Sequence, residues 1–339
     1  MFSSVTWERL SHSIKTALAC LVGFLITALF SFDIDQWLII TIIVVMCAQL
    51  RVGSVIQKSY MRFLGTLSGS IIALITIILF SDNELAYAFA IAGSAMIFSY
   101  IATGEKSYAE SGTLGAATVV IILIGQDPTL KIALERFMEI SLGILIAAVI
   151  SQFIFPVHAR KHLKQLQSET IKKLKEFYLI NQGQESGIEN YEEYQNLEEV
   201  ISQLLIMQRK LSVEAARELM GEEFKKIKFQ QLLRTEIGIR RSITFMHYIN
   251  QRLKSKSGWV QDEKSLKSFQ NLVVEILDKA AVLIEKKGNA SDYDVIRKNL
   301  MLLQSCIKDK NHDFPKSYMY TIEMFVDYLG ALVNLLNKH

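Results

Sequence analysis

The sequence predicts an all-α membrane protein in which six membrane-spanning helices, arranged as two inverted three-helix repeats, precede a cytoplasmic helical bundle. Three observations predict this fold. Half of the 339 residues are hydrophobic, which is more than an ordinary soluble domain contains. Residues 1–156 hold only 8 Lys/Arg and 10 Asp/Glu, whereas residues 157–339 hold 29 and 24. Finally, two apolar segments 74 residues apart share one pattern. We therefore expect a transmembrane transport domain over 1–156 and a cytoplasmic α-helical domain over 157–339.

Six apolar segments account for the first domain, because a helix needs ~20 mostly apolar residues to cross a hydrocarbon core of ~30 Å. They are Ile14–Phe32, Trp37–Leu50, Phe63–Phe80, Leu85–Ile101, Gly112–Gly125 and Ile132–Phe155. The second and fifth are short, and both take the same position in the repeat. The Lys and Arg residues near the ends of the spans predict that both chain termini lie in the cytoplasm.

The charged half is expected to form about five helices, because its apolar residues recur at helical spacings. The last helix, Tyr318–Leu336, is apolar enough to suggest a seventh span. Glu323 and Asp327 would each cost about 2.5–3.5 kcal/mol at the membrane centre. We therefore predict that this helix belongs to the bundle.

The repeated segments are Arg62–Ala73 and Arg136–Ala147, in which arginine, phenylalanine, glycine, isoleucine and alanine occur at equal offsets. Because each copy holds three spans, an odd number, the second copy enters the bilayer inverted relative to the first. Inverted repeats are common in transporters, and their transport path lies at the repeat interface.

Arg62 and Arg136 are the leading candidates for binding an anion, because a guanidinium is always charged and holds a carboxylate through two hydrogen bonds. We expect each to lie at a helix N-terminus, Arg62 at the cytoplasmic mouth and Arg136 at the opposite one, with Thr66 adding a hydroxyl. Two plainer interpretations stay open. Arg62 snorkels to the membrane surface, or Arg136 forms an ion pair with Glu135 or Glu139.

Glu139 is a carboxylate inside the sixth apolar segment, and two roles are open for it. It couples transport to protons, since desolvation and a nearby arginine shift a carboxyl group's protonation in opposite directions. Alternatively, it is the permanent counter-ion of Arg136, three positions earlier on the same helix face.

Small residues at helical spacing predict close helix packing in lipid. These positions are Gly65, Gly69, Gly112, Gly115 and Gly143. In particular, we expect the third helix to cross its repeat mate, which carries Gly143, at short distance.

Several classes of function find no support in the sequence. The net charge of +3 is small and interleaved with acids, which argues against nucleic acid as a partner. There is no phosphate-binding loop and no nucleophile elbow, so we do not expect an enzyme. His158 and His162 have a metal-binding spacing but no cysteine or carboxylate cluster beside them, so neither a metal nor a cofactor is expected.

The residues that open the third and sixth spans resemble those of a known family. The motifs are Arg62-x-x-Gly65-Thr66-x-x-Gly69, Arg136-x-x-Glu139-x-x-x-Gly143 and the exit Phe155-Pro156-x-x-Ala159-Arg160. Over about residues 5–165 the chain resembles the fusaric-acid-resistance-like (FUSC) or aromatic acid exporter family, which is distantly similar to plant aluminium-activated malate transporters. The resemblance implies a bacterial inner-membrane exporter, embedded in membrane lipids, for small organic anions such as aromatic carboxylates.

Many relatives carry two such six-span units in one chain, so the resemblance also implies that this chain forms a homodimer, and some longer members work with a periplasmic adaptor. We accordingly expect an exporter in which Arg62, Thr66 and Arg136 bind the anion and Glu139 couples its movement. One rival is a passive anion channel. The other is a non-transporting membrane scaffold whose bundle recruits a partner.

Overall fold

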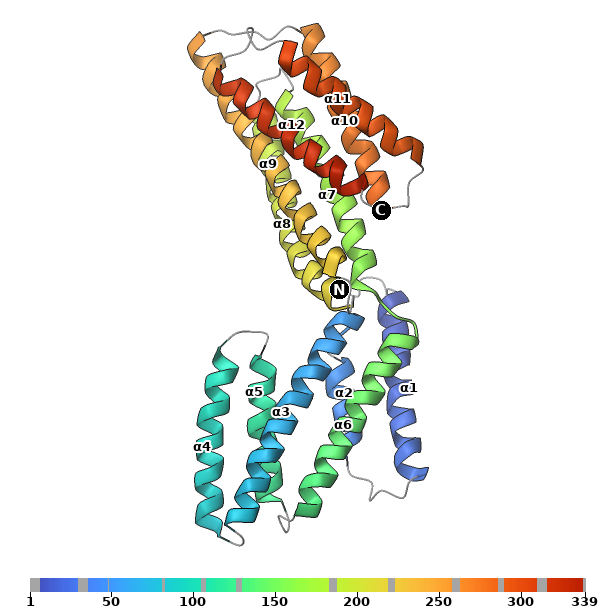
Figure 1. Ribbon diagram of the computed structural model, residues 1–339, viewed down its shortest axis with the longest axis vertical. Coiled ribbons are helices and arrows are strands. Elements are labelled where there is room, and N and C mark those ends of the chain that lie inside the picture. Colours follow the sequence, from blue (N-terminus) through green and yellow to red (C-terminus); the bar gives the residue numbers. More distant parts are fainter. Residues whose placement is uncertain are drawn as a thin grey trace. The chain divides into compact units, whose positions relative to one another are not determined.

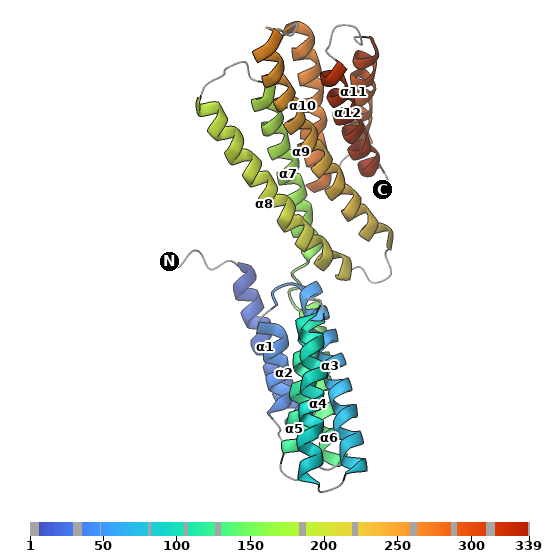
Figure 2. The same cartoon turned by 90° about the vertical axis from the view of Figure 1, so that its left-hand side faces the viewer.

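The computed structural model describes residues 7–29, 36–47, 49–80, 83–104, 108–125, 130–182, 188–218, 223–257, 263–285, 290–309 and 316–337. These residues form twelve helices and no strand, which confirms the all-α prediction (Figures 1 and 2). The chain divides into two compact units, residues 1–158 and 159–339. Each is described by itself below.

Six helices build the unit 1–158. They are α1 (Trp7–Leu29), α2 (Trp37–Cys47), α3 (Val52–Leu79), α4 (Glu84–Thr103), α5 (Ala109–Ile124) and α6 (Leu130–Phe153). Each predicted apolar segment corresponds to one of them. The start of the third was wrong, because α3 begins at Val52 and not at Phe63. Gln57, Lys58 and Arg62 interrupt the apolar run, but none of them breaks a helix.

Length and composition single out four helices of the described residues as able to cross a membrane: α1, α3, α4 and α12. Helices α2 and α5 are apolar but have only 11 and 16 residues. Helix α6 has 24 residues, and its first half carries Lys131, Glu135, Arg136 and Glu139. Three of the six predicted spans, α1, α3 and α4, are thus among these four helices.

Contacts within this unit follow a repeated scheme. In this scheme α1 corresponds to α4, α2 to α5 and α3 to α6. Helix α3 packs against α4 and α5, and correspondingly α6 packs against α1 and α2. Helix α4 packs against α5, and correspondingly α1 packs against α2. Helices α3 and α6 also pack against each other and run in opposite directions (Figure 1). At their contact the rings of Phe63 and Phe137, which hold equal positions in the two repeated segments, have centroids 5.9 Å apart. Exchanging α1–α3 for α4–α6 therefore leaves the pattern of contacts unchanged.

The unit 159–339 contains six helices in the described residues, one more than predicted. They are α7 (Ala159–Gln182), α8 (Ile188–Glu218), α9 (Glu223–Ser257), α10 (Glu263–Glu285), α11 (Ala290–Asp309) and α12 (Lys316–Asn337). The prediction missed the division between α8 and α9, for which Gly221, a poor helix former, was the available signal. All six helices contribute to one hydrophobic core.

Helix α12 is apolar because this core surrounds it. Phe325, Leu329 and Leu332 are fully buried, and the helix packs against α9, α10 and α11. Its neighbours carry many charged residues, for example α9, with a Lys/Arg-rich sequence. Burial inside a bundle thus accounts for a composition that, by length and hydropathy alone, also suits a membrane span.

Candidate functional site

Arg62 lies in the middle of the first unit and not at a helix end. It is the eleventh residue of α3, which begins at Val52, so about 15 Å of helix precede it. The expected position at a helix N-terminus was therefore wrong, and unpaired backbone N–H groups do not add to its positive potential. The side chain is only 5% exposed, so it does not snorkel to a surface of this unit either.

The Arg62 guanidinium has little of its hydrogen-bonding capacity satisfied. Its Nη2 donates to the hydroxyl of Thr41 on α2 at 3.3 Å, and its buried Nε has no hydrogen-bond partner among the described residues. Glu110 exerts a favourable electrostatic effect on Arg62, but Glu110 is itself paired with Lys58 at 3.5 Å. Within the described part of the chain Arg62 forms no ion pair, and a carboxylate is the ligand that a guanidinium binds best.

Further polar side chains share the Arg62 face of α3. Ser59, Thr66 and Ser70 are each no more than 5% exposed, and their spacing from Arg62 places them on one side of the helix. The hydroxyls of Ser59 and Ser70 lack hydrogen-bond partners among the described residues. The sequence analysis singled out Thr66 and missed Ser59 and Ser70. The signal was a polar residue at every third or fourth position of an otherwise apolar helix.

Arg136 differs from Arg62 in having a carboxylate partner. It is the seventh residue of α6, again away from the helix end where we expected it. Its Nη1 lies 3.2 Å from Oε2 of Glu139, and its guanidinium carbon lies 5.8 Å from the ring centre of Trp37 on α2. In the repeat, Glu139 takes the position that Gly65 has beside Arg62. The ion pair is the counter-ion arrangement that the sequence left open.

The predicted packing glycines lie where helices approach closely. A Cβ on Gly65 or Gly69 would come within 2.6 Å of a backbone oxygen of α5, and one on Gly112 within 2.5 Å of a backbone oxygen of α4. A Cβ on Gly115 would meet the ring of Phe98 at 2.4 Å, and one on Gly143 would lie 2.8 Å from the carbonyl oxygen of Leu38 on α2. Helices α3 and α6 do pack against each other, as expected, but Gly143 is not at that crossing because it packs on α2.

A second polar cluster is buried in the unit 159–339, where α7, α8 and α9 meet. Gln208 donates from Nε2 to the hydroxyl of Thr170 at 2.7 Å. Glu236 is completely buried, and neither its oxygens nor Oε1 of Gln208 have a hydrogen-bond partner among the described residues. Desolvation raises the pKa of Glu236 well above its ordinary value, and the nearby Gln208 opposes this. A protonated carboxyl group carries an O–H donor, which is the kind of group that a buried amide oxygen without a partner requires.

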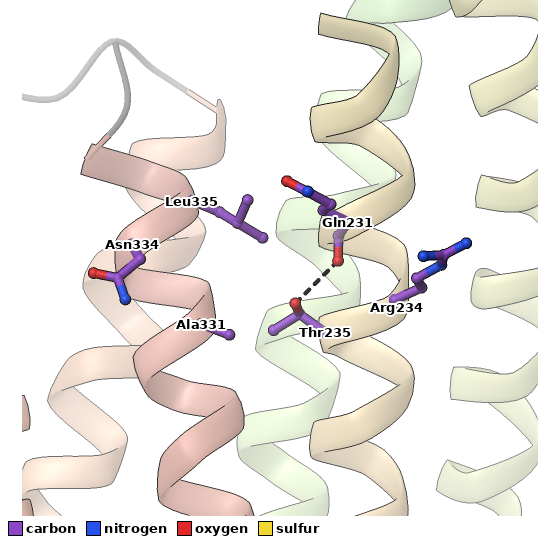
Figure 3. A pocket seen from close by; sticks show the side chains of 6 residues that line it. All are labelled: Gln231, Arg234, Thr235, Ala331, Asn334 and Leu335. Carbon is purple, nitrogen blue, oxygen red and sulfur yellow. Dashed lines mark hydrogen bonds between the residues drawn. The ribbon is translucent and has the colours of Figure 1, made fainter. Parts of the chain in front are cut away.

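A groove of about 310 Å³ lies between α9 and α12 in the same unit. Its lining consists of Gln231, Arg234, Thr235, Ala331, Asn334 and Leu335. The hydroxyl of Thr235 donates to the carbonyl oxygen of Gln231 at 2.9 Å, and Arg234 points away from α12 (Figure 3). No charged group therefore points into the groove from these residues.

Three known proteins are similar to this chain in sequence. Inner membrane protein YeeA of Escherichia coli K12 is 30% identical over 154 residues, which cover 45% of this chain and 43% of YeeA. Multidrug resistance protein MdtO of the same strain is 26% identical over 52% of this chain and 27% of MdtO. Aluminum-activated malate transporter 1 of Triticum aestivum is 26% identical over 50% of this chain and 41% of the plant protein.

The chain thus spans less than half the length of each of these relatives. The match to a family is broader than the match to any of the three, because residues 9–281 fit the sequence profile of one family. These residues include most of α1, all of α2–α9 and most of α10. The chain belongs to the fusaric acid resistance protein family.

Proposed function

We propose that the protein is an integral membrane transporter that exports organic anions, aromatic carboxylates among them, across the bacterial inner membrane. The observation that carries the proposal is Arg62, a 5%-exposed guanidinium without an ion pair among the described residues. A buried charge is costly unless something compensates it, and in membrane proteins such residues mark substrate pathways. The names of two relatives, a multidrug resistance protein and a malate transporter, support transport as the general function.

In this proposal α1–α6 are six spans in two inverted repeats, with both termini in the cytoplasm. The repeated scheme of helix contacts supports the inversion, and the Arg136–Glu139 ion pair lowers the cost of placing α6 in lipid. Short helices at equivalent positions of two repeats point to a binding site. Helices α2 and α5 are such a pair, and α2 provides Thr41, the hydrogen-bond partner of Arg62.

The assembly in this proposal is a homodimer whose bundles face the cytoplasm. MdtO, in which the matched 185 residues make up only 27% of the length, is about twice as long as this chain and supports two copies of the six-span unit per transporter. A periplasmic adaptor as a partner is a prediction from the resemblance alone.

A flux assay tests the function. The purified full-length protein is reconstituted in liposomes, and the uptake of radiolabelled benzoate and malate is compared with that of empty liposomes. We expect Arg62→Gln to reduce the initial rate at least tenfold. The matched control is Arg160→Gln, since the Arg160 side chain is exposed, and it should stay within twofold of the wild type. Wild-type flux equal to that of empty liposomes would refute the proposed function.

The ion pair of Arg136 and Glu139 favours one alternative mechanism, a passive anion channel. A carboxylate that is the counter-ion of a guanidinium, here at 3.2 Å, supports a mechanism without a proton cycle. A channel predicts reversal potentials that follow the anion gradient in planar bilayers and stay the same between pH 6 and pH 8. A proton-coupled carrier predicts uptake that depends on the pH gradient and loses this dependence in Glu139→Gln.

A further inference from the structure

Lys15 is a second buried cation in the unit 1–158, and the sequence analysis did not single it out. It is the ninth residue of α1 and is 0% exposed. Its ammonium group has no hydrogen-bond partner among the described residues. Ser11, Ala19 and Gly23, which are also buried, lie on the same face of the helix. That face packs toward α2 and α6, since Ala19 belongs to a hydrophobic cluster with Ile42 and Ala147.

The surroundings of Lys15 are a histidine and an apolar cluster. His12, one turn earlier, has a ring nitrogen, Nε2, 3.1 Å from the carbonyl oxygen of Met46 near the end of α2. Its other ring nitrogen, Nδ1, is buried and without a hydrogen-bond partner in the part of the chain that the structure describes. His12 and Lys15 are close enough to influence each other electrostatically. No acidic side chain of the described residues forms an ion pair with Lys15.

This arrangement differs from the other lysines with which it can be compared. Lys58 is paired with Glu110, and Lys131, at 83% exposure, is paired with Glu135. A long side chain at a membrane helix usually reaches the surface or a carboxylate. Lys15 reaches neither, so an anion from outside the described chain is the group that satisfies it best.

We propose that Lys15, with His12 beside it, forms an anion-binding site between α1 and the C-terminal end of α2, where it takes the carboxylate of the transported organic anion. This inference rests on the proposed function. The two cations, Arg62 and Lys15, then lie near the same helix, α2. Arg62 of α3 contacts α2 at Thr41, and His12, one turn before Lys15 on α1, contacts α2 at Met46. These contacts are five residues apart, or about 7.5 Å along the helix. A carboxylate released by one cation therefore has a second one near the same helix.

Thermal unfolding and flux of three full-length variants test the site. Lys15→Met keeps the length of the side chain without the charge, Lys15→Arg keeps the charge, and Lys131→Met removes an exposed lysine as the control. We expect 10 mM benzoate to raise the thermal midpoint of the wild type, Lys15→Arg and Lys131→Met, but to raise that of Lys15→Met less than half as much. Benzoate flux should fall at least tenfold in Lys15→Met alone.

Without benzoate, Lys15→Met should unfold at the wild-type temperature or above it, because it removes an uncompensated buried charge. A lower midpoint there would assign Lys15 a structural role and overturn the proposal. So would a benzoate-dependent shift equal to that of the wild type. If the wild type moves neither benzoate nor malate, the proposed function fails, and the thermal shift still decides whether Lys15 binds the anion.

Discussion

Replacing Gly69 by alanine probes the packing that holds α3 against α5. An added Cβ would lie 2.5 Å from the carbonyl oxygen of Gly115 and 2.9 Å from the Cβ of Thr118. Carbon atoms in contact are about 3.5–4.0 Å apart, so α3 and α5 would have to separate by about 1 Å. The obstacle on α5 is backbone, which cannot rotate away. Overpacking of this kind costs about 1–3 kcal/mol.

Gly93 provides the matched control, because a Cβ there meets nothing within 4 Å. It lies inside α4, so Gly93→Ala gains only the better helix propensity of alanine, about 0.5–1 kcal/mol. Gly69→Ala receives the same gain inside α3, so the difference between the two variants isolates the overpacking term. For a unit of 158 residues, a difference of about 1–3 kcal/mol separates the thermal midpoints by about 2–12 °C.

Thermal unfolding of the full-length protein in detergent, followed by the loss of the monodisperse peak in size-exclusion chromatography, measures this difference. Gly69→Ala should unfold first, the wild type next and Gly93→Ala last or together with the wild type. Gly143→Ala should lie between Gly69→Ala and the wild type, because its closest approach, to the oxygen of Leu38, is 2.8 Å. A Gly69→Ala midpoint at or above that of Gly93→Ala would refute the reasoning.

Three further predictions concern charged groups. Burial raises the pKa of Glu236, so the folded protein binds the carboxyl proton of Glu236 more tightly than the unfolded chain does, and stability is lost as pH rises from about 4.5 toward the folded pKa. Glu236→Gln should therefore be more stable than the wild type at pH 8. An equal fall of the thermal midpoint between pH 5 and pH 8 in the wild type and the variant would contradict this. Glu139→Gln removes the carboxylate that pairs with Arg136, whose side chain is only 20% exposed, so we expect a lower thermal midpoint. The double variant Arg136→Gln/Glu139→Gln should partly restore the midpoint, whereas additive effects of the two substitutions would show that the ion pair does not stabilise the protein. Glu218 accepts a hydrogen bond from the backbone N–H of Ala159 at the start of α7 (2.7 Å) and so caps this helix. Glu218→Ala should lower the free energy of unfolding, measured by chemical denaturation, by about 0.5–2 kcal/mol. An unchanged denaturation midpoint would exclude this capping role.

Hydrophobicity was enough to find the six helices of the unit 1–158, because each of them has a long apolar sequence. It did not find their ends where charge lies inside a helix. Lys58 and Arg62 were assigned to a boundary, although an ion pair and a hydrogen bond hold them inside α3. The boundary between α8 and α9 was missed because the helical period continues on both sides of Gly221, and a single glycine is a weak signal against it.

Sequence comparison between the two repeats predicted which residues are equivalent, but not what each contacts. Phe63 and Phe137 occupy equal positions and meet each other, which follows if an axis relates the two copies. The glycines occupy equal positions as well, but their partners lie on α5 and α2, helices whose sequences show no matching motif. The sequence analysis missed Lys15 because a single lysine in an apolar segment does not by itself indicate a site. Only its burial and its lack of a partner set it apart.

One of the differences between the repeats explains why their arginines are not equivalent. The position three residues after Arg62 is Gly65, and the position three residues after Arg136 is Glu139. Glycine lets α5 approach α3 to a distance that no side chain would permit, and it leaves the guanidinium without a neighbouring carboxylate. Glutamate neutralises its arginine on the same helix face. In the proposed transporter the duplicated helix thus serves two purposes, because one copy is stabilised by an internal ion pair and the other keeps a charge for an anion from outside. Removing the carboxylate tests this division without adding bulk, because Glu139→Gln should leave Arg136 able to bind an anion. A benzoate-dependent rise of the thermal midpoint no larger than that of the wild type would contradict it.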